Sequence, residues 1–124
     1  MTPVLVAVGG AFGACTRYLV DRRVQSWHDA AFPFGTLVVN VLGSLVLGFL
    51  TGATFFGVAA PVAQSLVGVG FCGALTTYST FGYETVRLFL DGGRLQAVGN
   101  LVATVLAGIG SGVLGLVIAA ALWL

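Results

Sequence analysis

Apolar residues run almost without interruption along this chain, and its charged residues are confined to two short segments. They lie within positions 17–29 and 84–94, which leaves residues 30–83 and 95–124 free of charge. Because a membrane-spanning helix needs about 20 mostly apolar residues, this pattern predicts an all-α membrane protein with four transmembrane helices. They form one domain over residues 1–124, with spans at about 3–20, 33–56, 62–90 and 95–123.

The third span is too long to cross a membrane as one straight helix. At 1.5 Å per residue, residues 62–90 would rise about 43 Å, against a hydrocarbon layer of about 30 Å. Five consecutive residues from Thr76 to Thr80 carry hydroxyls, and Gly73 weakens the helix shortly before them. We therefore predict a broken third helix, unwound around Gly73 to Thr77. Its freed backbone must be buried in protein or line a wet cavity, unless these hydroxyls simply bond to carbonyls of their own helix.

The composition excludes several classes of function. Only 7% of the residues are charged, whereas a soluble domain carries about 25%. The net charge of +1 offers no basic surface for nucleic acid. The sequence has no nucleophile paired with a base, no metal-ligand cluster and no phosphate-binding loop, so we do not expect an enzyme. Cys15 and Cys72 fall on different spans and are interpreted as small apolar residues.

Glycines recur at the spacing that lets membrane helices pack closely. Three pairs lie four residues apart, namely Gly9 with Gly13, Gly48 with Gly52, and Gly108 with Gly112. This pattern predicts a tight bundle. Four short helices can hardly enclose a lined pathway alone, so we also expect self-association or a partner subunit.

Uncharged polar residues within the spans are the candidates for function. Asn40 in the second span can donate to an anion or bond to a neighbouring helix, and the sequence leaves both open. Tyr78 and Phe81 share a face if the helix resumes after the break. The positive edges of their rings can tolerate an anion, although such a pair also suits core packing. Asn100 and Thr104, one turn apart in the fourth span, suggest a second polar rail or a structural pair.

Three charged side chains near the span ends are interpreted as structural. Arg17 can reach the interface or pair with Asp21, four residues later, and so fix the depth of the first span. Glu84 and Arg87 are three residues apart and are expected to neutralise each other.

Three motifs in order along the chain resemble the Fluc (CrcB) family of small fluoride channels. The first runs from Gly9 to Tyr18 (GGAFGACTRY) and the second from Phe34 to Ser44 (FGTLVVNVLGS). The third, which is highly specific, runs from Gly70 to Phe81 (GFCGALTTYSTF) and is followed by Glu84. The four-span plan extends this resemblance over the whole chain.

The resemblance implies a multi-pass protein of the cell membrane that exports fluoride passively. It further implies an antiparallel dimer with fluoride pathways near the interface and a structural Na⁺ at its centre. The Na⁺ ligands map to the backbone carbonyls of Gly73 and Thr76 in each subunit. The fluoride pathway maps to Asn40, Tyr78, Ser79, Thr80, Phe81 and Thr104, and Arg17 maps to the basic residue that closes the first motif.

Two positions depart from the family pattern, and they keep other interpretations open. Tyr78 stands where phenylalanine is usual, and Asn100 stands where the fourth span usually carries tyrosine. A phenol adds bulk and a donor beside the path, so one alternative is a non-conducting partner subunit of a heterodimeric channel. The other alternative is a small four-helix multidrug exporter. That class needs an acid inside the membrane, normally in the first span, and residues 1–16 contain none.

The arginines predict the orientation of the chain in the membrane. All five lie in or beside the two polar loops, at Arg17, Arg22, Arg23, Arg87 and Arg94. By the positive-inside rule these loops face the cytoplasm and both termini lie outside. Such a strong bias suits pairing with an oppositely oriented homologue better than pairing of two identical copies.

Overall fold

The computed structural model describes residues 2–27 and 32–123, and that part of the chain contains helices and no strand. The expected all-α class is therefore confirmed. The elements in chain order are α1 (Thr2–Ser26), α2 (Phe34–Phe55), α3 (Pro61–Ala63), the π-helix η1 (Gln64–Cys72), α4 (Gly73–Leu75), α5 (Ser79–Leu90) and α6 (Arg94–Trp123).

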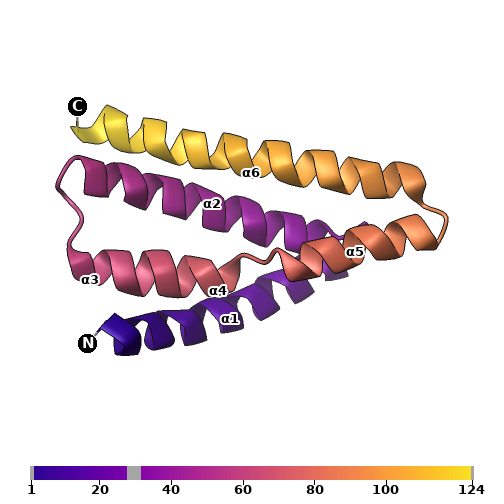
Figure 1. Ribbon diagram of the computed structural model, residues 1–124, viewed down its shortest axis with the longest axis horizontal. Coiled ribbons are helices and arrows are strands. Elements are labelled where there is room, and N and C mark those ends of the chain that lie inside the picture. The colour runs from indigo at the N-terminus through magenta and orange to yellow at the C-terminus, as the bar shows by residue number, and fades with distance from the viewer. Residues whose placement is uncertain (1, 28–31, 124) are drawn as a thin grey trace.

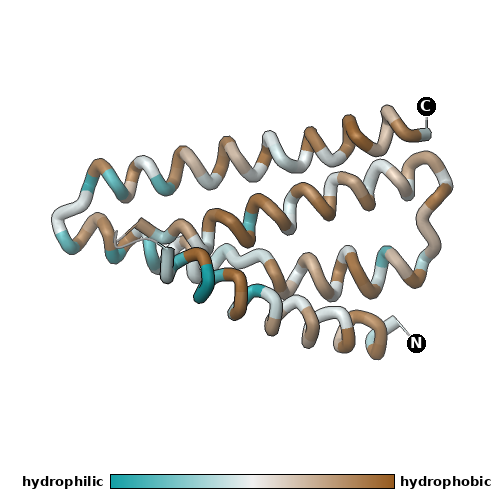
Figure 2. The backbone as a smooth tube through the Cα atoms, turned by 180° about the vertical axis from the view of Figure 1, so that it is seen from behind, coloured by the Kyte–Doolittle hydropathy of each residue, from teal (hydrophilic) through white to brown (hydrophobic). Residues whose placement is uncertain are grey.

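The long helices lie side by side, with α2 in the middle (Figure 1). On one side α2 packs along most of α6, and on the other it meets α1 and the segment from α3 to α4. The connection from α2 to α3 lies at the same end as the start of α1 and the end of α6. Hydrophilic residues gather toward the opposite end, where α1 ends and α5 turns into α6 (Figure 2). The two ends of the molecule are thus chemically different.

Three helices have the length and apolar composition to cross a membrane: α1, α2 and α6. The protein is accordingly a multi-pass membrane protein. The segment between α2 and α6 is divided into pieces too short to cross alone, and its role as a fourth crossing stays a prediction. Helix α1 also runs to Ser26, beyond the predicted end at residue 20. Long arginine side chains at its end can keep their charges in water while the helix continues. Residues 28–31 of the predicted loop lie outside the described residues.

The predicted break is present, but it begins later than the sequence suggested. Gly73 has helical torsion angles, φ −62° and ψ −37°, and the helix ends only at Leu75. Thr76 is extended, with φ −79° and ψ 159°, and α5 begins at Ser79. The unwound residues are therefore Thr76 to Tyr78. The reason is that Gly73 to Leu75 continue a helix already formed by η1, whereas the hydroxyl residues after them have other partners.

The glycine pairs lie where helices touch. Gly9 and Gly13 of α1 rest against the backbone carbonyls of Leu66 and Phe71 in η1, so a side chain at either glycine would strike main chain. Gly48 of α2 faces the Gly112 carbonyl of α6 in the same way. The close packing predicted from the glycine spacing is thus confirmed at these contacts, because glycine lets the helix backbones approach directly.

Candidate functional site

The site is built around the break, and Asn40 of α2 holds it in place. The Asn40 Nδ2 donates to the Thr77 carbonyl at 3.1 Å, and the Thr77 N–H donates to Asn40 Oδ1 at 2.8 Å. Only 9% of Asn40 is exposed, so both bonds form away from solvent. One side chain thus satisfies both backbone groups of an unwound residue, which lipid could not do.

Rerouted hydrogen bonds at the break free two carbonyls. In a continuous helix the Thr77 N–H would donate to Gly73 and the Thr80 N–H to Thr76. The first goes instead to Asn40, and the second goes to Thr77 Oγ1 at 3.2 Å. These are the two carbonyls that the sequence analysis assigned to a cation. Thr76 itself bonds back to the Cys72 carbonyl through its N–H at 3.0 Å and its Oγ1 at 2.8 Å.

A glycine of α2 makes room for the extended residue. The Cγ2 methyl of Thr76 occupies the position that a Cβ at Gly43 would take, and Leu75 packs just beyond it. Gly43 and Asn40 are three residues apart and lie on one face of α2. The second motif therefore supplies both a space for Thr76 and hydrogen bonds for Thr77.

The aromatic pair after the break is divided between two environments. The ring centroids of Tyr78 and Phe81 are 6.3 Å apart, at an interplanar angle of 59°. Phe81 is 8% exposed and Tyr78 is 86% exposed. Ser79 is also exposed, whereas Thr80 is partly buried. The residues from Tyr78 to Phe81 therefore lead from the surface of the chain to its interior.

A small cavity connects the break to the charged end of α1. Its volume is about 160 Å³, and its lining includes Arg17, Asp21, Thr36, Thr77 and Thr80. The structure thus brings Arg17 and Thr80 together, as two of the predicted site residues. The sequence analysis did not single out Thr36 or assign Thr77 a role of its own. Their signal in the sequence was their position, since Thr36 stands in the motif from Phe34 to Ser44 and Thr77 in the motif from Gly70 to Phe81.

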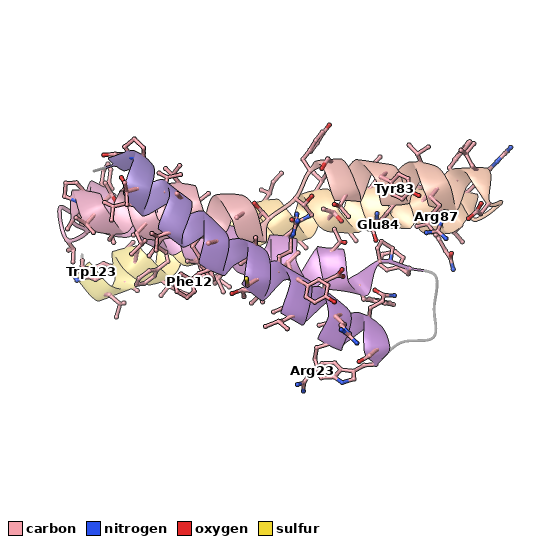
Figure 3. The ribbon with its side chains drawn as sticks, turned by 90° about the horizontal axis from the view of Figure 1, so that it is seen from below. Phe12, Arg23, Tyr83, Glu84, Arg87 and Trp123 are labelled. Atoms are coloured by element: carbon pink, nitrogen blue, oxygen red, sulfur yellow. The ribbon has the colours of Figure 1, made fainter. Side chains whose placement is uncertain are left out.

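The structure gives Glu84 a direct partner other than Arg87. Glu84 Oε1 accepts a hydrogen bond of 2.6 Å from Thr36 Oγ1, and Thr36 is 3% exposed. Arg87 pairs with Asp91 instead, through Nε and Oδ2 at 3.8 Å, where both side chains are about 70% exposed. Figure 3 shows Glu84 and Arg87 toward one end of the molecule and Trp123 at the other. For Arg17 and Asp21, the described residues show a shared cavity and no salt bridge.

A second polar cluster joins α5 to α6. Asn100 Nδ2 donates to Thr85 Oγ1 at 2.9 Å, and Thr104 Oγ1 donates to Asn100 Oδ1 at 3.3 Å. Asn100 is only 1% exposed. Asn100 and Thr104 therefore do form the pair that their spacing suggested. Thr85, which completes the cluster, was not identified from the sequence because one hydroxyl on a helix has no distinctive pattern.

These features define a class of protein: a small multi-pass membrane protein whose polar groups converge on an interruption within a helix. The carbonyls, hydroxyls and amides there are uncharged groups that can replace the hydration shell of an ion. They include no pair of groups suited to covalent catalysis.

The chain belongs to the family described as "CrcB-like protein, Camphor Resistance (CrcB)", whose model matches residues 4–116. It is 53% identical over 123 residues to "Fluoride-specific ion channel FluC 1" of Streptomyces avermitilis, which covers 99% of each chain. It is 52% identical over 128 residues to the protein of the same name in Frankia casuarinae, again over 99% of each. The archaeal "Fluoride-specific ion channel FluC" of Methanopyrus kandleri is 46% identical over 119 residues, covering 95% of this chain and 88% of its own. The relatives are thus named as ion channels, a class without enzymatic activity.

Proposed function

We propose that this chain is a subunit of a fluoride-specific channel that exports fluoride passively across the cell membrane. The observation that carries the proposal is the interrupted helix, whose unwound residues are held by Asn40 and are followed at once by the hydroxyls and the aromatic pair. Near-identity in length to relatives named as fluoride channels, at 52–53% identity, supports the same activity here.

The polar groups suit a small, strongly hydrated anion. Such an ion must exchange water for hydrogen-bond donors, and a full positive charge in the path would trap it. Ser79 and Thr80 offer hydroxyls, and the second Nδ2 hydrogen of Asn40 is not needed for its bond to Thr77. Thr104 is proposed to line the path, where its hydroxyl would have to leave Asn100 Oδ1 to donate to the anion. Phe81 and Tyr78 add ring edges, whose partial positive charge favours an anion. Arg17 of α1 lines the same cavity as Thr77 and Thr80, and we propose a structural part for it.

We further propose that Na⁺ binds the carbonyls of Gly73 and Thr76 and plays a structural part. The residues fit such an ion, because the amides that would occupy these carbonyls in a helix donate to Asn40 and Thr77 instead. When bound, the ion would provide a positive partner for carbonyl oxygens that lack a hydrogen-bond donor. No ionised side chain is required for this role, since carbonyl oxygens are suitable ligands for a hard cation.

The proposed assembly is an antiparallel dimer. Gly73 is compatible with it, because the residue is exposed and a Cβ built there meets nothing within 4 Å, which leaves room for a second subunit beside the break. The arginines bear on the choice of partner. Four of the five lie in the last turns of α1 or beside the turn from α5 to α6, so one orientation is favoured. We propose an oppositely oriented homologue as the partner, with a second copy of this chain as the competing case.

Flux from liposomes tests the proposed function. The purified chain, alone and with a homologue of opposite arginine bias, is reconstituted in vesicles loaded with fluoride. Passive fluoride efflux supports the channel, whereas proton-coupled exchange of an organic cation would identify a drug exporter. Efflux only in the presence of the homologue would identify a partner subunit.

Tyr78 is the observation that favours a partner subunit as the second candidate, because its phenol is 86% exposed beside the proposed path. The variant Tyr78→Phe separates the two candidates. Efflux gained by this variant would show that the phenol blocks the pore of this subunit.

A further inference from the structure

The hydroxyl of Thr85 links the backbone of Phe81 to α6. It donates to the Phe81 carbonyl at 2.8 Å and accepts from Asn100 Nδ2 at 2.9 Å. Asn100 Oδ1 in turn accepts from Thr104 at 3.3 Å. The result is a chain of hydrogen bonds that starts on α6, crosses to α5 and ends one turn earlier, at the backbone of the buried aromatic residue.

The chemistry of these groups determines which of them donates and which accepts in each hydrogen bond. A hydroxyl has one proton, and Thr85 gives it to Phe81. Thr85 can therefore only accept from its neighbour on α6, and the NH₂ group of Asn100 is the donor that it needs. Asn100 is 1% exposed, so neither water nor lipid replaces the amide. An ionised aspartate of the same shape could not donate this bond.

Helix α5 depends on such contacts for its orientation. It begins after an extended residue, so its rotation about its own axis is not inherited from α4. Its consecutive residues Glu84 and Thr85 bond in different directions, the first to Thr36 of α2 and the second to Asn100 of α6. Together these two bonds fix the rotation of α5 that leaves Phe81 buried, with 8% of it exposed.

We infer that Asn100 is a positioning residue for the proposed anion path: through Thr85 it sets the rotation of α5 and thereby the placement of Phe81. The expected effect of Asn100 on fluoride rests on the proposed function, whereas its expected effect on the rotation of α5 does not. The role also explains why residue 100 is an amide. Both the Nδ2 and the Oδ1 of Asn100 are bonded to other side chains of the protein, which a residue that only lined the path would not need.

The test compares hydroxyl and amide variants of the full-length chain. Thr85→Val and Asn100→Asp remove the link at nearly constant volume, and Thr85→Ser keeps the hydroxyl. Thr51→Val is the matched control, since Thr51 Oγ1 makes the same bond to the residue four earlier, Leu47, at 2.7 Å on the exposed face of α2. Two quantities are measured: fluoride efflux from liposomes, and hydrogen exchange of the backbone amides of residues 79–90.

We expect Thr85→Val and Asn100→Asp to speed exchange in α5 and to lower efflux about tenfold, whereas Thr85→Ser and Thr51→Val match the parent. The double variant should be no worse than the worse single, because both break one link. Unchanged exchange in both single variants would overturn the inference, as would failure of Thr85→Ser to restore it. A parent that carries no fluoride, either alone or with the homologue, would count against the proposed function alone, since the exchange comparison still decides whether Asn100 holds α5.

Discussion

The side chain of Asn40 on α2 and the backbone of Thr77, 37 residues later, form a closed pair of hydrogen bonds. Each partner donates once and accepts once, as two strands of a sheet would. The amide thus replaces the backbone partners that Thr77 loses when the helix unwinds. This relationship explains how an interruption can exist inside a chain whose surroundings offer few other partners.

Replacing Asn40 with aspartate should abolish fluoride flux. Asn40→Asp keeps the acceptor for the Thr77 N–H, but it sets a second acceptor against the Thr77 carbonyl and adds negative charge beside the path. We expect a loss of about 1–3 kcal/mol in stability from the mismatched bond. Efflux from liposomes and thermal unfolding in detergent measure the two effects separately. Normal efflux in this variant would reduce Asn40 to a packing residue.

A side chain at Gly43 should displace the break. The methyl of Thr76 occupies the space that Gly43→Ala would fill, so the extended residue must move, at a cost of about 1–3 kcal/mol. Gly99→Ala is the control, because a Cβ at Gly99 of α6 meets nothing within 4 Å. The unfolding midpoint should fall for the first variant only. Equal midpoints would mean that Thr76 is free to shift.

Loss of the Thr36 hydroxyl should weaken the attachment of α5 to α2. Thr36→Val leaves the partly buried Glu84 carboxyl without its 2.6 Å donor, and we expect a loss of about 1–3 kcal/mol. Thr36→Ser keeps the donor and should behave like the parent. Denaturation curves of the three proteins provide the comparison, and a serine variant as unstable as the valine variant would contradict the assignment.

Bulk at Gly73 should block assembly without unfolding the subunit. Inside the chain Gly73→Val finds open space, so any strong defect must arise from a second subunit. Thr76→Ser should be mild, because the proposed ligand is a carbonyl and the serine hydroxyl can still bond to Cys72. Size-exclusion chromatography with and without Na⁺ reports assembly. A fully assembled Gly73→Val protein would remove the proposed contact between the breaks.

The arginine distribution predicts a single orientation in the membrane. A reporter fused after α6 should be active on the outer side only, since the arginines lie toward the other end of the molecule. Removing arginines tests whether they determine the orientation. Replacing Arg22 and Arg23 with glutamine should produce a population with both orientations. Equal populations of the unaltered chain on both sides, with efflux by this chain alone, would favour two identical subunits.

Composition and periodicity were sufficient to predict helices, close glycine packing and an interruption near Thr76. They failed where the outcome depends on partners distant in sequence. The spacing of Glu84 and Arg87 along one helix did not reveal Thr36 of α2, which donates a partly buried hydrogen bond to the Glu84 carboxyl. The start of the break shifted for a related reason, because helical geometry persists until an amide finds a better acceptor, which first happens at Thr77.

The π-helix was also beyond prediction from sequence. Its nine residues, Gln64–Cys72, are apolar or small apart from Gln64 and would suit an ordinary helix equally well. What distinguishes them is the neighbour, since Gly9 and Gly13 of α1 bring its backbone directly against theirs. The glycine spacing predicts this close approach, but not that the neighbouring helix takes π geometry where it occurs.

The bond between Asn40 and Thr77 has a consequence for the order in which the protein is made. Asn40 leaves the ribosome before Thr77, so the amide that the unwound residues need is made before them. The earlier helix thereby acts as a template for the later one. A permuted gene that encodes residues 61–90 ahead of α2 would deliver the same side chains with the template missing, and its product should be removed by quality control before it can assemble.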